Sequence, residues 1–599
     1  MIQINDKVDC CGCNACGDAC AHGAISFKTD NEGFWYPEVD KEKCNDCHLC
    51  EKVCPIINVK ELKKNDLPQS VCYAAEHKNL EVVFDSTSGG LFSALADIMY
   101  KSGGYVGGAV FNDDFSVRQY ISNDKKDLPR LRSSKYLQSH LDGFYKQVRD
   151  LLKDGEKVLV CGSPCQMAAL RAFLRKDYDN LIIADFICRG TNSPKVWRKY
   201  LDSYEERYGS KVVYCKAKSK EYGWRNLTQK VILANGKAYY ETKDQNNFTK
   251  GYLQTNAYCR PACYDCKFKG FPRIADITLA DFWGIEKIDP SFEKNLGTSL
   301  VMINSKKGEA YFEEVKKRIN YTEMPFEQSI KGNKALIQSL PPSKVERDAF
   351  FADLDKMSFI ELSKKCHFSE TKKSGLKGKL KKLVRSLRVF IKFTQLKPVA
   401  LWQFFKYNTL SEISKGNMMI PTPHTVIELH KGGRIVKEGL SVIGVKKAQK
   451  SKVETRILVE EGGTLYLGPG TKLMYGADIE VFKGATLIWK GAGGCNINGT
   501  VICGERIEIG RGVMMGRNVT IRDNNGGHYL NRNGYKNTRP VIIGDKAWLC
   551  EQCVIMPGVK IGDGAIVGAC SFVINKVPAN AMVSGNPAKV VDTDVLWKY

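Results

Sequence analysis

Residues 10–20 read CCGCNACGDAC, and residues 44–54 read CNDCHLCEKVC. The two stretches repeat one spacing, C-x2-C-x2-C-x3-C, and Pro55 follows the second repeat. Nine of the chain's 23 cysteines fall within the first 54 residues. Because the chain shows no secretory leader, such crowding predicts a metal site rather than a disulfide framework.

The spacing favours two 4Fe–4S clusters over zinc. Three thiolates two residues apart wrap one face of a cuboidal cluster, and the fourth cysteine of each run ligates the other cluster. Zinc instead prefers paired C-x2-C knuckles. Cys11 has no place in the pattern, and we expect it to be packed or free. The expected ligand sets are Cys10, Cys13, Cys16 and Cys54 for one cluster, and Cys44, Cys47, Cys50 and Cys20 for the other.

The composition is that of a globular protein with an excess of basic residues. The 599 residues correspond to about four domains, and 90 Lys and Arg against 66 Asp and Glu give a net charge of +24. That excess suggests an acidic partner, such as a phosphate, a nucleotide cofactor or an anionic membrane. The first residues carry no basic and apolar leader, and no apolar run reaches the roughly 18–20 residues of a membrane span. We therefore expect a cytoplasmic protein.

Strands and helices alternate between residue 61 and about residue 365. KVLVCGSPCQMAALRAFL (157–174) reads as an apolar strand, a turn and a helix from about Cys165. LIIADFICRGTNSPKVW (181–197) repeats that plan, with a helix from about Ser193. The alternation predicts a parallel sheet, whose ligands bind beyond the carboxyl ends of the strands. Cys165 and Cys188 both lie just past such ends.

FDSTSGG (84–90) stands at the start of an amphipathic helix. Its glycines let a phosphate approach the backbone, and a helix N-terminus supplies N–H donors. Taken alone, a Ser-Gly stretch before a helix is more often a simple cap.

Five motifs follow the cysteine runs in order: STSGG (86–90), RSSKYLQSHL (132–141), CGSPCQ (161–166), FICRGTNSPKVW (186–197) and CRPACYDCKFKGFPRIADITLADFWG (259–284). With those runs, over roughly residues 1–365, they closely resemble the beta-subunit family of coenzyme F420 hydrogenases and dehydrogenases. The resemblance implies FAD, iron–sulfur centres, and electron transfer between an organic substrate or hydride carrier and one-electron clusters. It also implies a flavin site lined by Ser86, Ser88, Gly89, Gly90 and Lys135. The alternative for Lys135 is a solvated surface lysine.

A third 4Fe–4S centre near the flavin would need four more thiolates. Cys263 and Cys266 form a further C-x2-C, and Cys259 lies four residues earlier. The expected set is Cys165, Cys188, Cys263 and Cys266, with Cys259 in reserve. Zinc and unligated thiols remain alternatives for these residues.

Residues 366–415 are strongly basic. Between 371 and 411 there are eleven Lys and Arg and no Asp or Glu, with Leu376, Leu380, Leu383 and Leu387 at helical spacing. A basic amphipathic helix suggests an anionic membrane surface, with Trp402, Phe404 and Phe405 as added anchors. The alternative is a helix packed between two domains. Nucleic acid is not expected, because no recognition module appears.

Aliphatic residues recur every six positions near the C-terminus. They are Ile509, Met515, Ile521, Ile543, Leu549, Ile555, Ile561, Val567 and Val573. This hexapeptide repeat predicts a left-handed parallel β-helix with three hexapeptides per coil, its aliphatic side chains pointing into the core. The stretch 522–541 interrupts the repeat and contains His528, which can act as a general base. The alternative is a loop histidine without a catalytic task.

The tail IGDGAIVGACSFVINKVPANAMVSGNPAKVV (561–591) resembles the sugar O-acetyltransferase branch of the hexapeptide acyltransferases. The resemblance implies acetyl-CoA as donor, His528 as base, and homotrimers with sites between subunits. It also implies that Asn518 orients the reacting groups, that Trp548 walls the site, and that a coenzyme A groove is lined by Ala569, Ser571, Lys576 and Lys589. Cys550 stands where relatives commonly have glycine, which puts the acyl-chain preference in doubt.

Together these patterns predict a multidomain α+β protein. The expected domains are a two-cluster ferredoxin domain (1–60), an α/β flavin and Fe–S oxidoreductase domain (61–365), a basic linker (366–415) and a left-handed β-helix acyltransferase (416–599). The favoured function is a bifunctional enzyme of surface-polysaccharide synthesis, with ferredoxin as electron donor, a sugar or lipid-linked glycan as substrate, and the linker near the membrane. One alternative is an oxidoreductase of energy metabolism with the β-helix as a trimerising scaffold, and another is a non-catalytic electron-transfer module.

Overall fold

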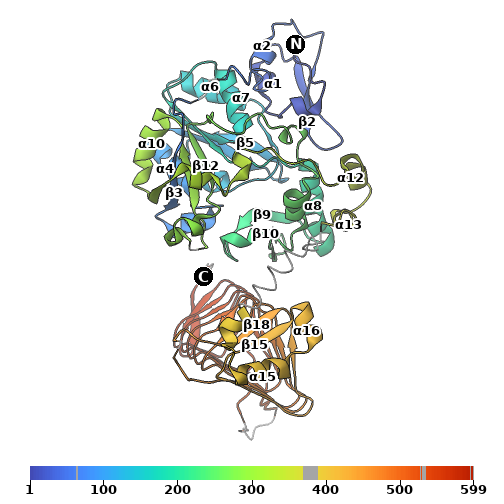
Figure 1. Cartoon of the computed structure of the whole chain (residues 1–599), viewed down its shortest axis with the longest axis vertical. Helices are drawn as coiled ribbons and strands as arrows, with labels where there is room; N and C mark the ends of the chain where they lie inside the picture. The colour runs from blue at the N-terminus through green and yellow to red at the C-terminus, as the bar shows by residue number, and fades with distance from the viewer. Residues whose placement is uncertain are drawn as a thin grey trace. The chain divides into compact units, whose positions relative to one another are not determined.

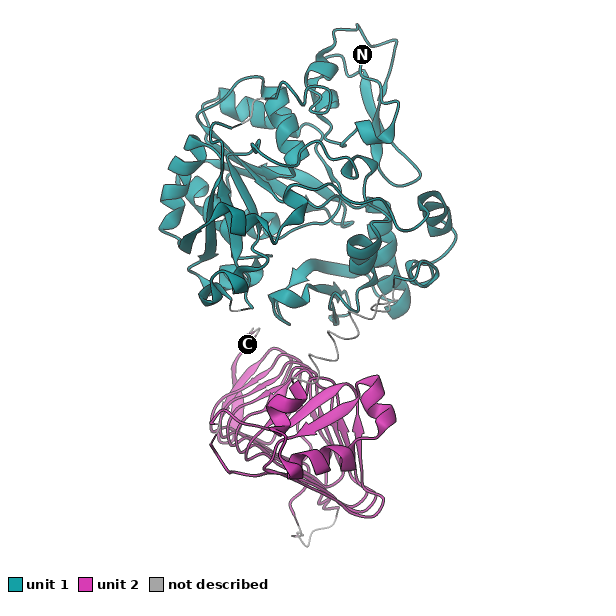
Figure 2. Ribbon diagram, in the orientation of Figure 1, with its two compact units in different colours: residues 1–372 teal, residues 373–599 magenta. Residues whose placement is uncertain are grey.

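The computed structural model describes residues 1–62, 65–293, 295–368, 389–448, 450–526, 528, 534–593, 595 and 597. The chain divides into two compact units, Met1–Lys372 and Lys373–Tyr599 (Figures 1 and 2). The first unit holds the cysteine runs and the strand–helix region, and the second holds the repeat. Among the described helices, none combines the length and apolarity that a membrane crossing requires.

A short helix lies within each cysteine run. α1 (Ala15–Ala19) begins after Asn14 and α2 (Leu49–Lys52) after His48, and both of these residues adopt the left-handed conformation. That conformation turns the chain sharply before the helix, so the earlier cysteines of each run fold back beside the helical one. Between the runs, β1 (Ile25–Thr29) and β2 (Trp35–Val39) form an antiparallel hairpin (Figure 1).

A nine-stranded mixed sheet forms the centre of the first unit, in the order β14-β3-β13-β12-β8-β7-β4-β5-β6. The expectation of a parallel sheet is correct only for its middle, where β12, β8, β7 and β4 run parallel. On either side the pairs β4–β5 and β12–β13 are antiparallel, since the short link 112–116 between β4 and β5 permits only a hairpin. The strands are β3 (Val71–His77), β4 (Tyr105–Phe111), β5 (Val117–Ser122), β6 (Ser139–His140), β7 (Val158–Gly162), β8 (Leu181–Phe186), β12 (Ile277–Asp281), β13 (Ser299–Ile303) and β14 (Ile319–Met324).

Helices cover both faces of this sheet. Leu159 packs in one core with α4 and α10, and its neighbours Val158 and Val160 pack in a second core with α6 and α7, as the alternation of a strand requires. Cys13 and Val53 belong to that second core, so the cysteine-rich segment packs on the α6–α7 side. The helices are α3 (Leu80–Asp85), α4 (Leu91–Lys101), α5 (Leu128–Leu131), α6 (Phe144–Lys153), α7 (Pro164–Leu174), α8 (Pro194–Tyr208), α9 (Asn247–Lys250), α10 (Lys306–Lys316), α11 (Phe326–Ile330), α12 (Arg347–Leu354) and α13 (Phe359–Lys365). A second, antiparallel sheet contains β9 (Val212–Ser219), β10 (Thr228–Leu233) and β11 (Ala238–Glu241).

The two expected strand–turn–helix units are present. A capping box between Ser163 and Gln166 starts α7, and Ser193 caps α8 by accepting a hydrogen bond from the Val196 amide. A proline occupies the first turn of both helices, where its missing N–H costs nothing. Cys165 therefore lies in the first turn of α7, and Cys188 follows the end of β8.

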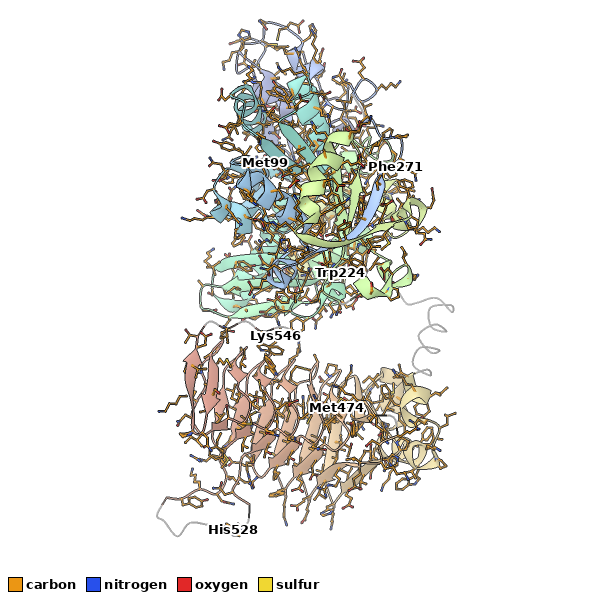
Figure 3. The ribbon with its side chains drawn as sticks, turned by 90° about the vertical axis from the view of Figure 1, so that its left-hand side faces the viewer. Met99, Trp224, Phe271, Met474, His528 and Lys546 are labelled. Atoms are coloured by element: carbon orange, nitrogen blue, oxygen red, sulfur yellow. The ribbon has the colours of Figure 1, made fainter. Side chains whose placement is uncertain are left out.

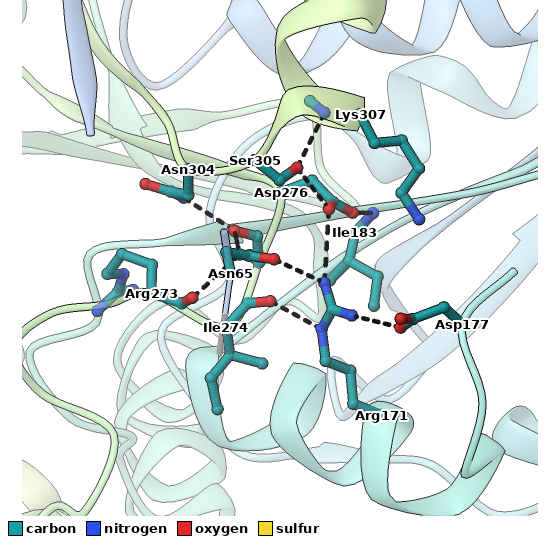
Figure 4. A network of polar contacts seen from close by, with 12 residues as sticks. Asn65, Arg171, Asp177, Ile183, Arg273, Ile274, Asp276, Asn304, Ser305 and Lys307 are labelled. Atoms are coloured by element: carbon teal, nitrogen blue, oxygen red, sulfur yellow. Dashed lines mark hydrogen bonds and ion pairs between the residues drawn. The ribbon is translucent and has the colours of Figure 1, made fainter. Parts of the chain in front are cut away.

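A buried polar network fixes the segment that leads from the C-x2-C motif into β12 (Figure 4). The Arg171 guanidinium donates to the carbonyl oxygen of Ile274 at 2.8 Å, and the Asn65 amide donates to the carbonyl oxygens of Arg273 and Ala275 at 3.0 and 2.6 Å. Asp276 accepts the Ile183 amide of β8 at 2.8 Å. These bonds hold the chain just after Cys266 against the sheet.

The second unit is a parallel β-helix with three faces (Figures 1 and 3). In its last coils, Trp548 pairs with Ile566 and Val554 with Phe572, so each coil takes three hexapeptides, as the repeat predicts. All nine aliphatic positions of the repeat are buried in one core. Their place in the core confirms the interpretation of the repeat as structural.

The strands of the β-helix fall into three ladders. The first face holds β15 (Met418–Pro421), β18 (Leu440–Val445), β21 (Lys472–Met474), β24 (Gly494–Cys495), β27 (Met514–Met515), β30 (Trp548–Leu549), β33 (Ile566–Val567), β35 (Met582–Gly585) and β36 (Ala588–Asp592). The second holds β16 (Thr425–Leu429), β19 (Thr455–Val459), β22 (Asp478–Val481), β25 (Thr500–Cys503), β28 (Thr520–Arg522), β31 (Val554–Ile555) and β34 (Phe572–Val573). The third holds β17 (Arg434–Lys437), β20 (Thr464–Leu467), β23 (Thr486–Trp489), β26 (Arg506–Ile509), β29 (Val541–Ile543) and β32 (Lys560–Ile561).

Part of the basic linker, residues 369–388, lies outside the described residues. Beyond it, α15 (Pro398–Tyr407) and α16 (Leu410–Lys415) precede the first coil. Gln403 and Tyr407 donate to the carbonyl oxygens of Thr425 and Ile427, each at 2.6 Å, so α15 packs on the β-helix. Phe404 is buried and the expectation of an interfacial anchor there is wrong, whereas Trp402 and Phe405 are exposed.

Candidate functional site

The first four expected cluster ligands lie together. Burial raises the pKa of Cys16, and the neighbouring thiols of Cys13, Cys10 and Cys54 raise it further. Burial also raises the pKa of Cys54, again with Cys13 and Cys10 as neighbours. A buried thiol surrounded by thiols is stable as a thiolate only against bound metal, which fits one face of a cubane cluster.

The second expected set lines a small cavity of about 20 Å³. The amides of Ile2 and Ala24 donate to the sulfurs of Cys50 and Cys20, each at 3.3 Å. Such N–H···S bonds stabilise thiolate ligands of iron–sulfur clusters. No three His, Cys, Asp or Glu side chains within the described ranges converge as they would on a single metal ion. The thiols that line this cavity are Cys20, Cys44, Cys47 and Cys50.

A cavity of about 690 Å³ occupies the first unit at the carboxyl ends of β7 and β8. It is lined by segments that lie far apart in the sequence: the loop before α4, the RSSK motif, the turns after β7 and β8, and the C-x2-C motif. Cys11 and Gly12 of the first cysteine run also reach its wall. Motifs that lie far apart in the sequence thus line a single cavity.

The loop before α4 is held close to the sheet. The Gly89 amide donates to Oγ of Ser299 at 2.9 Å, and a Cβ at Gly89 would lie 2.4 Å from the carbonyl oxygen of Ala75. Only glycine therefore fits there without moving the backbone. Gly90 has φ +87° and turns the chain into α4, whose first residues line the cavity. A helix N-terminus at a cavity wall offers N–H donors to an anion.

The two serines of this loop line the cavity with their hydroxyls already engaged. Ser86 donates to the carbonyl oxygen of Val82 at 2.7 Å, and Ser88 donates to that of Thr298 at 2.8 Å. Each hydroxyl oxygen keeps acceptor capacity after donating. These hydrogen bonds fix the conformation of the loop at the cavity wall.

Lys135 is part of the cavity wall rather than a solvated lysine. Its Nζ donates to the carbonyl oxygens of Arg130, Leu131 and Arg132 at 2.7, 3.2 and 2.9 Å. Burial lowers the pKa of Lys135 to about 7. In this structure the amine caps the end of α5 at the cavity wall.

The four thiols expected for a third cluster all line this cavity. Burial raises the pKa of Cys188 to about 12, and the nearby thiols of Cys165 and Cys266 contribute to the rise. Burial raises the pKa of Cys263 as well, followed by the influence of Cys188. Cys259, the reserve ligand, is fully buried and donates to Oδ1 of Asn192 at 3.5 Å.

Cys11 connects two groups of thiols. The pKa of Cys11 is raised first by hydrogen bonds with Cys13 and Cys165 and then by burial. The same contact with Cys11 is the main cause that lowers the pKa of Cys165 to about 7. Sequence spacing left Cys11 unassigned, and the structure places its sulfur between the first cysteine run and the cavity.

Three lysines near the loop before α4 were not predicted from the sequence. Lys216 pairs with Asp85 and Lys218 with Asp281, each at 2.6 Å, while Lys220 donates to the carbonyl oxygen of Ser88 at 2.5 Å. The signal is present in VVYCKAKSK (212–220), where lysines at every second position of a strand share one face. Lys216 and Lys220 thus contact the chain before and within the loop that precedes α4, and Lys218 lines the cavity.

The loop that carries His528 leaves the β-helix between β28 and β29 (Figure 3). Asn524 and Thr538 form a β-bridge at its base, and Asn537 donates to the carbonyl oxygen of Gly526 at 2.8 Å. Asp523 is fully buried and accepts three backbone amides of residues 504–506. The base of the loop is therefore rigid, and His528 itself is exposed.

One chain does not bring the expected transferase residues together. The His528 loop leaves at the corner between the second and third faces, whereas Asn518 and Ala569 occupy turns between the first and second faces. Trp548 lies on the first face, 40% exposed, with its ring 5.7 Å from that of Trp597. Ser571 is buried and accepts the Gly585 amide at 3.2 Å. Lys576 and Lys589 are exposed.

Comparison with known proteins identifies three parts of the chain. Residues 9–57 match the 4Fe-4S dicluster domain. Residues 155–329 match the family formed by the C terminus of the coenzyme F420 hydrogenase/dehydrogenase beta subunit. Residues 540–575 match the "Bacterial transferase hexapeptide (six repeats)" family.

Curated relatives match the C-terminal part. The chain is 30% identical over 149 residues to galactoside O-acetyltransferase of Escherichia coli K12, which covers 24% of this chain and 70% of that protein. It is 32% identical over 98 residues to a putative lipopolysaccharide biosynthesis O-acetyl transferase of the same strain, covering 14% of this chain and half of that one. Among solved structures, a chain of the F420-reducing [NiFe] hydrogenase complex of Methanosarcina barkeri superposes with a TM-score of 0.32 at 18% identity, covering 51% of this chain and 94% of that chain.

Proposed function

The chain belongs to the bacterial hexapeptide-repeat transferases and carries an iron–sulfur oxidoreductase domain of the coenzyme F420 hydrogenase/dehydrogenase beta-subunit type, and we propose that it is a bifunctional enzyme. One half is an iron–sulfur flavoprotein reductase. The other half transfers acetyl from acetyl-CoA to a sugar hydroxyl.

The reductase proposal rests on one observation, the cavity of the first unit. At about 690 Å³ it lies within the ~300–1,000 Å³ of cofactor pockets, and it joins a glycine-rich loop and a helix N-terminus to four thiols. A bound FAD would exchange hydride with an organic substrate and single electrons with iron–sulfur centres. Ser86, Ser88, Gly89 and Gly90 would then surround its phosphates.

Two other groups of the cavity take defined tasks in this proposal. Nζ of Lys135 would donate to the flavin pyrophosphate instead of to backbone carbonyl oxygens. The negative charge of the pyrophosphate would raise the pKa of Lys135 toward that of an ordinary lysine. A third 4Fe–4S centre would be held by Cys165, Cys188, Cys263 and Cys266. Cys11, between Cys13 and Cys165, would fill the gap between that centre and the first cluster.

In the transferase half, His528 would take the proton from the acceptor hydroxyl as general base. Asn518 would orient the reacting groups and Trp548 would wall the site. A homotrimer would account for the separation of these residues within one chain, because the corner with the His528 loop would then meet a different corner of the next subunit. The residues proposed for the coenzyme A groove are Ala569, Ser571, Lys576 and Lys589.

The relative named as a putative lipopolysaccharide biosynthesis O-acetyl transferase favours a role in surface-polysaccharide synthesis. We further propose a ferredoxin-type electron donor, a sugar or lipid-linked glycan as acceptor, a cytoplasmic location and a left-handed β-helix. The basic linker at 366–415, between the oxidoreductase domain (61–365) and the transferase domain (416–599), would keep both near the membrane surface.

The two halves are tested by two assays on one pair of proteins. The wild-type chain is expected to release coenzyme A from acetyl-CoA with a sugar acceptor, and a His528→Ala variant is expected to lose this activity by about 100-fold or more. Reduction of the bound flavin by dithionite should be unchanged in that variant. Absence of acetyl transfer by the wild type over a panel of sugars and nucleotide sugars would contradict the transferase half.

A further inference from the structure

Arg260, which directly follows Cys259, reaches from the C-x3-C-x2-C segment into the first cysteine run. Its Nε donates to the carbonyl oxygen of Cys10 at 2.8 Å, and one terminal nitrogen lies 3.5 Å from the sulfur of Cys10. The other donates to Oε1 of Gln138 at 2.7 Å. The side chain is only 1% exposed. A full positive charge is therefore buried against an expected ligand of the first cluster.

The described surroundings of Arg260 contain no carboxylate at ion-pair distance. Its described hydrogen-bond acceptors are Cys10, Gln138 and the carbonyl oxygen of Trp35, and the rings of Tyr36 and Phe34 lie 4.3 and 5.4 Å from the guanidinium. A buried charge without a counter-charge is costly by several kcal/mol. The nearest group that could supply a negative charge is the thiolate of Cys10, together with the cluster that it would ligate.

A second arginine, Arg347 at the start of α12, pairs with Glu32 in the turn between β1 and β2. Arg347 forms a two-point ion pair with Glu32 through Nε and a terminal nitrogen, each at 2.6 Å. Its charge is thus neutralised by a carboxylate. Docking of the cysteine-rich segment therefore explains the ion pair of Arg347, but it does not explain why the charge of Arg260 is buried without a carboxylate partner.

We propose that Arg260 is a positioning residue that raises the reduction potential of the first cluster, ligated by Cys10, above that of the second. Reduction adds one negative charge to a cluster, and a buried cation beside a ligand stabilises that charge. The first run also reaches the cavity wall through Cys11 and Gly12, whereas the thiols of the second set line a separate cavity. Arg260 thus directs single electrons from a ferredoxin-type donor inward, with no bond made or broken.

This inference rests on the proposed passage of electrons through both clusters, and it is tested by EPR-monitored redox titration of the anaerobically purified full chain. In Arg260→Met the ratio of oxidised to reduced first cluster at a fixed potential should rise at least tenfold, which is 59 mV for a one-electron couple. The second cluster, whose signal is identified through Cys47→Ser, should keep its potential. Gln138→Glu adds a carboxylate beside Arg260 without removing the side chain, and should lower the same potential.

The matched control is the double variant Glu32→Gln/Arg347→Met, which removes the docking ion pair as a neutral unit and should leave both potentials in place. Equal shifts of both clusters in Arg260→Met, or no shift in Arg260→Met and Gln138→Glu, would overturn the role of Arg260. If Arg260→Met fails to hold the first cluster, Gln138→Glu decides alone. A wild type without iron would instead refute the proposed function itself, so the two failures are distinct.

Discussion

Replacing Arg273 by methionine should destabilise the first unit strongly, because it leaves a buried carboxylate without its partner. Arg273 donates to Oδ2 of Asp185 at 2.6 Å, and Thr278 donates to Oδ1 at 2.5 Å. The two charged side chains are 3% and 0% exposed. Removing one partner of such a pair costs about 3–5 kcal/mol. We expect a loss of that size in the free energy of unfolding of Arg273→Met.

The double variant Asp185→Asn/Arg273→Met separates the unpaired charge from the lost packing. An asparagine carries no charge and keeps an oxygen for Thr278, so the double variant should recover most of the loss and unfold within about 2 kcal/mol of wild type. Urea unfolding followed by tryptophan fluorescence measures both variants, with the transition of the β-helix unit as an internal reference.

The loss should also depend on pH. Burial already raises the pKa of Asp185, and Arg273 opposes that rise, so the pKa must rise further in Arg273→Met. A carboxyl with a raised pKa in the folded state binds its proton more tightly there than in the unfolded chain, so stability falls as the pH rises through that range. Arg273→Met should therefore be more destabilised at pH 7 than at pH 5. A single variant within about 1 kcal/mol of wild type, or a double variant no more stable than the single one, would refute this reasoning.

Three further outcomes follow from the same site. Lys135→Met should weaken FAD binding by about 10- to 100-fold, the worth of one charge-assisted hydrogen bond, measured by flavin fluorescence on the deflavinated protein; unchanged affinity would remove Lys135 from the flavin site. Cys165→Ser should lower the iron content by about four atoms per chain, as loss of one 4Fe–4S centre requires, whereas Cys215→Ser, at a buried thiol of the second sheet outside the cavity, should keep the full content; equal iron in the two variants would contradict a third cluster there. Gly89→Ala should cost about 1–3 kcal/mol because its Cβ meets the carbonyl oxygen of Ala75 at 2.4 Å, while Gly103→Ala, where nothing lies within 4 Å of the added Cβ, should cost about 1 kcal/mol for its φ of +76°; thermal unfolding of both ranks them, and the reverse order would be a contradiction.

The spacing of residues in the sequence predicted the parts of the fold that depend on local sequence pattern. The cysteine runs predicted which thiols gather, and the six-residue period predicted the core of the last coils. The upstream coils escaped that period, because Met418 pairs with Leu440 and Gly494 with Met514, so each of these coils is longer than three hexapeptides. Their turns differ in length, so a fixed period of six does not reveal them.

The cavity could be predicted only in outline. Strand ends and glycines marked Ser86 to Gly90, Cys165 and Cys188, but the cations at Lys216, Lys218 and Lys220 come from another sheet. Residue spacing does not reveal the roles of Arg260 and Cys11, since these roles arise from contact between segments that lie far apart in the sequence. Pairings across such distances follow from packing, which one sequence without its structure does not specify.

The most direct test of the whole account is the metal and flavin content of the full chain purified without oxygen. Iron, acid-labile sulfide, zinc and flavin are quantified together with an absorption spectrum. The account predicts about twelve iron atoms and one FAD per chain, the sum of three four-iron centres. Colourless protein with zinc as its only metal, and no flavin even after reconstitution, would contradict it.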